Sequence, residues 1–100
     1  MPHAYIAGTG LYVPDNVVTN ADMSRWFDTS DAWIHERSGI RERRWIDREM
    51  GPSDLALPAA EQALAEAGIA ATELDLIVFA TLSPDAYFPG SGVFLQEKLG

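Results

Sequence analysis

The apolar run from Leu74 to Leu82 constrains the fold of this chain more than any other feature of the sequence. It reads Leu-Asp-Leu-Ile-Val-Phe-Ala-Thr-Leu, so an extended segment would be apolar on nearly all of both faces. Strands at a protein surface alternate between apolar and polar residues, whereas central parallel strands are covered on both sides and read as continuous apolar runs. The run therefore predicts a central parallel strand.

An alanine-rich helix is predicted just before this strand. Ser53 is placed to cap it and Gly68 to end it, and its apolar residues recur at helical spacing along one stripe. Because alanine dominates the stripe, we expect the helix to pack closely against a sheet. Pro58 falls early in the pattern, where a proline can kink the first turns.

The other predicted elements alternate between extended and helical segments. Gly8 and Gly10 do not make a dinucleotide fingerprint, which needs a third glycine and an immediately following helix. We instead expect these two glycines to allow close packing of a buried strand. The expected elements are a strand over 4–13, a turn at 14–16, a helix from 19 or 20 through 27, a helix from 30 or 31 to 39, an edge strand or hairpin over 41–46, and a helix over 93–99.

This order of strands and helices indicates an α/β fold with a doubly wound core. A central parallel strand needs neighbours on both sides, and the chain offers only two good strands and one doubtful one. We therefore expect residues 1–100 to be one incomplete part of a larger domain, with no linker and no second domain.

Basic residues are concentrated in one short stretch of an otherwise acidic chain. The formal net charge is −8, yet five of the seven Lys and Arg residues fall within residues 37–48. Trp33 lies one helical turn before Arg37, so the two share a helix face. An aromatic ring beside guanidinium groups suits a nucleotide-bearing phosphate ligand. The same pattern equally fits a solvated helix end followed by a salt-bridged strand.

The composition excludes several other classes of function. The chain has no cysteine, so it offers no disulfide, no thiolate nucleophile and no cysteine-based zinc site. His3 and His35 are too few for a metal cluster, and His35 has no evident carboxylate partner for base catalysis. The acidic balance disfavours nucleic-acid binding. Because no signal peptide or membrane span is visible, we expect a cytoplasmic protein without membrane contact.

One family resemblance covers the whole chain. It rests on the order and spacing of several blocks: Gly8-Thr9-Gly10, Val13-Pro14, Thr19-Asn20-Ala21-Asp22, Asp28–Arg44, Ala65–Ile69, Leu76–Thr81 and Phe88-Pro89. The block Asp28–Arg44 reads DTSDAWIHERSGIRERR and is the most specific of these. Together they closely resemble the first third of β-ketoacyl-acyl-carrier-protein synthase III, a thiolase-like condensing enzyme.

The resemblance implies a fold, a reaction and a set of partners. It implies a thiolase-like αβαβα fold, of which this chain is the opening part of the N-terminal half. It implies a homodimeric acyltransferase that condenses an acyl-CoA primer with malonyl-acyl-carrier protein by a decarboxylating Claisen reaction. The acyl-CoA is a substrate, and no cofactor or metal is expected. The pathway would be fatty acid or related polyketide biosynthesis.

The resemblance also implies roles for four residues. The tryptophan matching Trp33 stacks on the CoA adenine, the arginine matching Arg37 contacts the nucleotide phosphates, and the threonine matching Thr29 lies beside the adenine. The phenylalanine matching Phe88 lies near the dimer interface and helps wall the partner's acyl pocket.

Departures from the family pattern keep a second hypothesis open. The family uses a Cys nucleophile with a His and an Asn, and neither the Cys nor a matching His or Asn is present here. The 100-residue chain therefore has no catalytic residues of its own and should be inactive alone. The alternative is a noncatalytic fragment or family member that binds CoA, carrier protein or a partner subunit. Gly90-Ser91-Gly92 also stands where many family members carry Ser and Ala after Phe-Pro.

Overall fold

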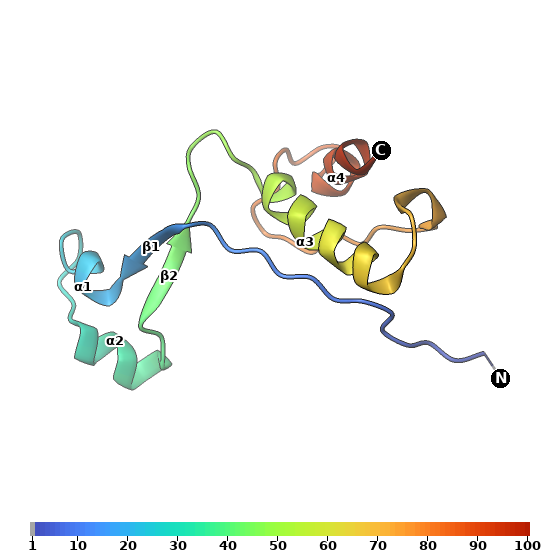
Figure 1. Cartoon of the computed structure of the whole chain (residues 1–100). Helices are drawn as coiled ribbons and strands as arrows, with labels where there is room; N and C mark the ends of the chain where they lie inside the picture. Colours follow the sequence, from blue (N-terminus) through green and yellow to red (C-terminus); the bar gives the residue numbers. More distant parts are fainter. Residues whose placement is uncertain (1) are drawn as a thin grey trace. The chain divides into compact units, whose positions relative to one another are not determined.

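The computed structural model describes residues 2–100 and contains a mixture of helices and strands (Figure 1). The chain forms two compact units. The hairpin unit is Val13–Asp47, and the helical unit consists of the segments before and after it. In chain order the elements are β1 Asn16–Thr19, α1 Asn20–Met23, α2 Asp31–Ser38, β2 Glu42–Trp45, α3 Pro52–Ala67, the 3-10 helix η1 Ala71–Glu73, and α4 Ser91–Leu99.

The hairpin unit is built on two antiparallel strands, which lie side by side in Figure 1. Val18 of β1 faces Arg43 of β2, and its side chain is buried. The predicted edge strand over 41–46 is confirmed as β2. Its partner β1 was not predicted, because Asn16 was assigned to a turn. The apolar pair Val17-Val18 is too short to show a period, so only the pairing with β2 identifies this strand.

Helix α1 is capped by Thr19, one of the two predicted caps, but is shorter than expected. The Thr19 hydroxyl accepts a hydrogen bond from the Asp22 amide at 3.1 Å, and the Asp22 carboxylate accepts one from the Thr19 amide at 2.9 Å. This reciprocal arrangement is a capping box. Hydrogen bonds donated to the Asp22 carboxylate by the Thr19 amide and the Thr19 hydroxyl hold the pKa of Asp22 below its ordinary value. The helix ends at Met23, so the prediction that it continues through Phe27 was wrong.

The early end of α1 has a local cause. The Ser24 hydroxyl donates to the Ala21 carbonyl, a local bond that competes with the helical ladder. Trp26 and Phe27 then follow in a turn, where both amides donate to the Met23 carbonyl at 3.1 Å. The Trp26 ring instead packs on Trp45, with 5.3 Å between ring centroids.

The two main helices of the helical unit pack against each other (Figure 1). Helix α3 runs without a break through Pro58 and ends at Gly68, which adopts a φ of 70°. It begins at Pro52 with Gly51 as its N-cap, so the prediction that Ser53 caps it was wrong by two residues. The Asp54 carboxylate supplies the local hydrogen bond by accepting from the Gly51 amide at 2.8 Å. Helix α4 starts two residues earlier than expected.

The predicted strands over 4–13 and 74–82 are not paired with any strand in the described residues. A strand is defined by hydrogen bonds to a neighbour, and the only ladder within residues 2–100 joins β1 to β2. Side-chain exposure along 76–79 still alternates as in a strand. Leu76 and Val78 are 77% and 83% exposed, while Ile77 and Phe79 are half-buried. The apolar run is therefore largely in solvent here, with one face turned inward.

The close packing predicted at Gly8 and Gly10 is confirmed, but the prediction of a buried strand was wrong, because the segment packs on a helix and leaves Tyr5, Ile6 and Leu11 exposed. A Cβ at Gly8 would lie 2.9 Å from the Ala67 nitrogen, and one at Gly10 would lie 3.0 Å from the Ala63 nitrogen. The segment that carries these glycines therefore lies directly on the backbone of α3. No helix in residues 2–100 is long and apolar enough to cross a membrane.

Candidate functional site

The strongest candidate for a ligand site is the exposed face of α2, where Arg37 lies over Trp33. The guanidinium carbon is 4.4 Å from the centroid of the indole ring. This confirms that the two residues share a face, and the distance is typical of a cation–π contact. Trp33 remains 53% exposed. One face of the indole is thus covered by a cation, and much of the ring is free to meet a planar ligand.

The ends of α2 are fixed by local signals in the sequence. The Ser30 hydroxyl accepts a hydrogen bond from the Trp33 amide at 3.1 Å, which confirms one of the two predicted caps. Gly39 ends the helix with a φ of 72°, a conformation that glycine adopts without a steric penalty. Because these signals set where the helix starts, they also set the face on which Trp33 and Arg37 project.

Thr29 lies immediately before this helix and carries an unusual hydroxyl. Its Oγ1 is buried and has no hydrogen-bond partner within the described residues. An unpaired buried hydroxyl costs about 1–3 kcal/mol, so most such groups have a partner in the functional state. The structure thus places an unsatisfied polar atom at the base of the helix that presents Trp33.

Asn20 connects α2 to the hairpin and was not singled out from the sequence. It is 1% exposed. Its amide nitrogen donates to Asp31 Oδ1 at 2.9 Å and to the Ile40 carbonyl at 2.7 Å, and its Oδ1 accepts from Arg43 at 2.8 Å. Asn20 therefore contacts both ends of α2 and strand β2. The partners are 11 to 23 residues away in sequence, so no local signal could have revealed this role.

We expect Asn20→Ala to lower the free energy of unfolding of the full-length protein by about 2 kcal/mol, because three polar partners lose a buried hydrogen bond. Asn16→Ala is the matched control, since Asn16 is an exposed asparagine of the same hairpin. Urea denaturation of both variants measures the difference. Equal midpoints for the two variants would show that the Asn20 network does not stabilise this unit.

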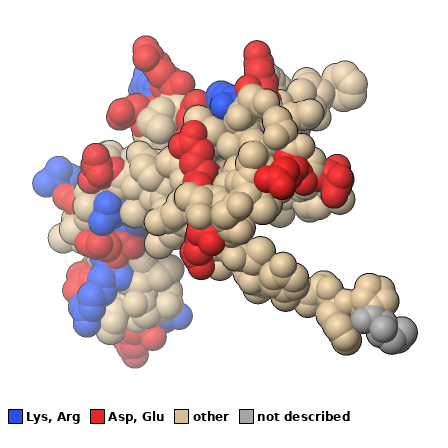
Figure 2. Space-filling model, turned by 45° about the vertical axis from the view of Figure 1, so that its right-hand side comes forward, with Lys and Arg blue, Asp and Glu red and all other residues tan. Residues whose placement is uncertain are grey.

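Two of the five clustered arginines have structural partners. Arg43 bonds to Asn20, and Arg44 donates to the Pro14 carbonyl at 2.8 Å. Within residues 2–100 the ion pairs are Arg25–Asp22 and Lys98–Asp54, so the salt-bridged strand considered from the sequence is not formed. Figure 2 shows Lys and Arg interspersed with Asp and Glu on the face in view. Arg43 and Arg44 therefore have structural roles in the hairpin, and of the clustered arginines it is Arg37, over Trp33, that we assign to the candidate site.

Phe88 lies in the helical unit, on the loop that precedes α4, and is 91% exposed. It belongs to a different unit from Trp33, Arg37 and Thr29, so each group is described separately. Neither group contains a nucleophile paired with a base. No three His, Cys, Asp or Glu side chains gather as a possible metal site within the described residues. The exposed indole and the adjacent guanidinium of the α2 face have the chemistry that suits a planar, anionic ligand.

Comparison with solved structures defines the class of protein. The 3-oxoacyl-[acyl-carrier-protein] synthase III of Aquifex aeolicus matches with a TM-score of 0.87 and 47% identity, over 94% of this chain and 30% of that chain. The priming β-ketosynthase of the R1128 polyketide pathway matches with a TM-score of 0.88 and 32% identity, over 95% and 28% of the two chains. The predicted thiolase-like condensing-enzyme fold is confirmed.

Comparison of sequences identifies the particular relatives. A β-ketoacyl-[acyl-carrier-protein] synthase III from Alkalilimnicola ehrlichii is 47% identical over 100 residues, which is all of this chain and 31% of the relative. The resemblance to β-ketoacyl-acyl-carrier-protein synthase III is therefore confirmed over the whole chain. The chain spans about 30% of the length of the relatives it matches. No family model matches the sequence.

Proposed function

We propose that this chain is the coenzyme A-recognising segment of a β-ketoacyl-acyl-carrier-protein synthase III. The full-length protein would condense an acyl-CoA primer with malonyl-acyl-carrier protein in fatty acid or related polyketide biosynthesis. The observation that carries this proposal is the Arg37–Trp33 stack on an exposed helix face, in a chain 47% identical to such a synthase.

The chemistry of CoA matches the residues of this face. The adenine is a planar base that can stack on the free side of Trp33, and the nucleotide carries phosphates that a guanidinium can bind with two donors. Thr29 supplies a hydroxyl whose oxygen has no partner in residues 2–100. Phe88 would contribute its exposed ring to the acyl pocket of a homodimer. The acyl-CoA is the substrate, and the proposal includes no cofactor, membrane or nucleic-acid partner.

The reaction itself needs residues that these 100 do not supply. A thiolate would have to accept the acyl group from CoA, and the chain contains no cysteine. The alternative function is that of a noncatalytic relative, which uses the same face only to bind CoA, carrier protein or a partner subunit. We expect the full-length protein to work in the cytoplasm, where acyl-CoA is available.

The test is an assay of the full-length protein with acetyl-CoA and malonyl-acyl-carrier protein, following the release of free CoA and of carbon dioxide. Release of both supports the synthase. Binding of CoA without release of either product supports the noncatalytic alternative. A protein that neither binds CoA nor releases products contradicts both proposals. The same protein without malonyl-acyl-carrier protein is the control for simple thioester hydrolysis.

A further inference from the structure

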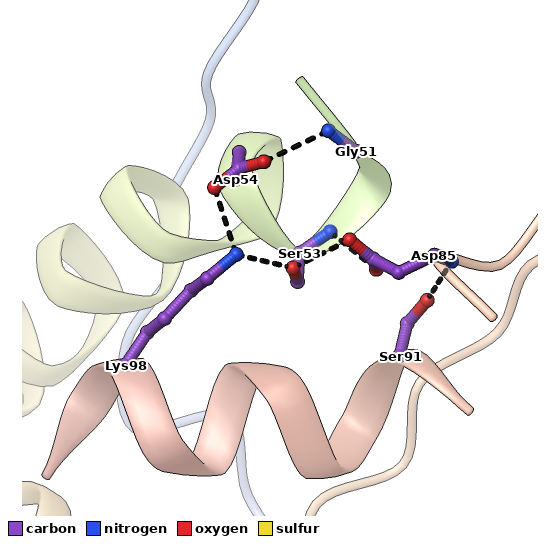
Figure 3. Close-up of polar contacts among 6 residues, drawn as sticks. All are labelled: Gly51, Ser53, Asp54, Asp85, Ser91 and Lys98. Carbon is purple, nitrogen blue, oxygen red and sulfur yellow. Dashed lines mark hydrogen bonds and ion pairs between the residues drawn. The ribbon is translucent and has the colours of Figure 1, made fainter. Parts of the chain in front are cut away.

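A polar network joins the start of α3 to the loop that precedes α4 (Figure 3). Its members come from two segments of the chain, and the hydrogen bonds that join these segments connect residues 32 to 45 positions apart. Ser53 at its centre is fully buried, with 0% exposure, and Ser91 is 3% exposed. The residues of the network are Gly51, Ser53, Asp54, Asp85, Ser91 and Lys98.

The centre of the network is a chain from a cation through a hydroxyl to a carboxylate. Lys98 Nζ lies 2.6 Å from Ser53 Oγ, and because an ammonium group can only donate, the hydroxyl oxygen accepts this bond. The Ser53 hydroxyl then donates to Asp85 Oδ2 at 2.8 Å, and the Ser53 amide donates to Oδ1 at 3.0 Å. Both carboxylate oxygens of Asp85 are therefore held. Ser53 itself is too buried to act as a nucleophile toward an external substrate.

Gly51 shows how closely Asp85 fits against α3. A Cβ added to Gly51 would collide with the Asp85 carboxylate, with Oδ2 and then with Cγ at 3.0 Å. The φ of Gly51 is −112°, which any residue adopts, so its backbone conformation does not require glycine. Glycine is needed at position 51 because the Asp85 carboxylate occupies the space that a side chain would fill.

Hydrogen bonds of the network hold both ends of the loop over residues 85–91. The Asp85 amide donates to Ser91 Oγ at 2.9 Å, and Ser91 is the first residue of α4. Between these fixed ends, Tyr87 and Phe88 are 93% and 91% exposed. Two large aromatic side chains are thus presented to solvent by a short loop whose ends are tied to buried groups.

We propose that Asp85 is a positioning residue that fixes this loop, and through Phe88 sets the length of the acyl primer that the enzyme accepts. The proposal rests on the proposed synthase function, which places Phe88 against the acyl group. Asp85 touches no substrate. Its carboxylate anchors the loop to Ser53, and its amide closes the loop onto Ser91.

The electrostatics of Asp85 agree with this role. Burial raises the pKa of its carboxyl group, but hydrogen bonds with the Ser91 and Ser53 side chains and with the Ser53 amide outweigh burial and leave the pKa below its ordinary value. A hydrogen bond from the Gly51 amide and then one from Lys98 likewise lower the pKa of Asp54. Both carboxylates are therefore charged at neutral pH, as partners of Lys98 and Ser53 should be.

Hydrogen exchange in the full-length protein tests the anchoring step without any assay of activity. We expect Asp85→Ala to speed exchange of the amide at residue 85, which donates to Ser91 Oγ in the wild type, by on the order of tenfold, the loss of about 1.4 kcal/mol of protection. Asp54→Asn is the matched control, because it removes a carboxylate of the same network that does not contact the loop. Unchanged exchange in Asp85→Ala, or equal acceleration in both variants, would overturn the proposal.

Primer selectivity tests the second step. We expect Asp85→Ala to raise the ratio of kcat/KM for octanoyl-CoA to that for acetyl-CoA by on the order of tenfold, because a loosened aromatic wall leaves more room. In a Phe88→Ala background the same change should alter this ratio by less than about twofold, since Asp85 acts through Phe88. A merely structural loss of stability would lower both kcat/KM values together.

The outcomes separate this proposal from the proposed function. A wild type that condenses neither primer overturns the synthase, while hydrogen exchange still decides whether Asp85 anchors the loop. An active wild type with faster exchange but unchanged selectivity in Asp85→Ala overturns the link to primer length. Faster exchange together with a selectivity change that disappears in the Phe88→Ala background supports both steps.

Discussion

Replacing Trp33 with alanine in the full-length protein should weaken CoA binding about 5- to 150-fold. Stacking of one base on an aromatic side chain contributes about 1–3 kcal/mol, and this range of free energies corresponds to that range of affinities. Trp33 is suited to such a stack because it is 53% exposed and is already ordered on one face by Arg37. Isothermal titration of CoA into wild type and variant measures the loss directly.

Substitutions of Arg37 should also weaken CoA binding. Arg37→Ala removes both the phosphate contact and the cation that orders the indole, so we expect a loss of affinity about as large as that of Trp33→Ala. Arg37→Lys keeps the charge but loses the planar fork that binds two phosphate oxygens at once. Its affinity should therefore lie between those of wild type and Arg37→Ala.

The chain offers a closely matched control for these variants. Trp26 belongs to the same unit and is 54% exposed, but its ring packs on Trp45. Trp26→Ala should leave CoA affinity within about twofold of wild type, as expected for a distant, independent site. If Trp33→Ala and Arg37→Ala bind CoA as well as wild type does, or if Trp26→Ala weakens binding equally, the α2 face is not the CoA site.

The parts of the candidate site that were predictable from the sequence depend on local signals. A capping serine, a terminating glycine and a spacing of four residues are enough to place Trp33 and Arg37 on one face of one helix. Asn20 lies beyond the reach of such signals. Its importance depends on partners such as Ile40 and Arg43, and only the folded hairpin brings these together.

The fold shows the same division between local and long-range information. The apolar run over 74–82 predicted a strand covered on both faces, but Leu76 and Val78 are largely exposed and no strand pairs with the run in residues 2–100. Strand β1 was not predicted, because here too the pairing partner and not the local pattern determines the structure. Its four residues carry almost no pattern, and the ladder to β2 alone makes them a strand. Both the covering of an apolar segment and its pairing in a sheet depend on neighbours that the local sequence does not contain.

Residues 8–11 pack tightly against α3, and the two glycines of the Gly8-Thr9-Gly10 motif predicted this close packing. Gly8 and Gly10 approach the backbone of Ala59, Ala63 and Ala67, which are spaced by one helical turn. The alternate amides bond to side chains of the same helix. The Leu11 amide donates to Gln62 Oε1 at 2.8 Å, and the Thr9 amide donates to Glu66 Oε2 at 3.4 Å. This register leaves no room for a Cβ at either glycine.

Gly10→Ala should therefore destabilise the full-length protein by about 3 kcal/mol or more, at or beyond the upper end of the usual cost of overpacking. The added Cβ would collide with the Ala59 carbonyl oxygen and lie 2.8 Å from the Ala59 carbonyl carbon. These are backbone atoms of a helix, so no side chain can rotate away to relieve the contact. Either the segment lifts from α3 and breaks the bond from Leu11 to Gln62, or the helix bends.

Gly92→Ala tests whether the steric contact, and not the change of residue type, causes this loss. Gly92 lies in the first turn of α4, where a Cβ would be 3.7 Å from the nearest atom, an ordinary contact distance with Phe79. Alanine is favoured over glycine in a helix interior by about 0.5–1 kcal/mol, so in the first turn this variant should be as stable as wild type or slightly more stable. In thermal melts the midpoint should fall for Gly10→Ala and should not fall for Gly92→Ala. A Gly10→Ala melt within a degree or two of wild type would mean that the segment does not lie on α3 in solution.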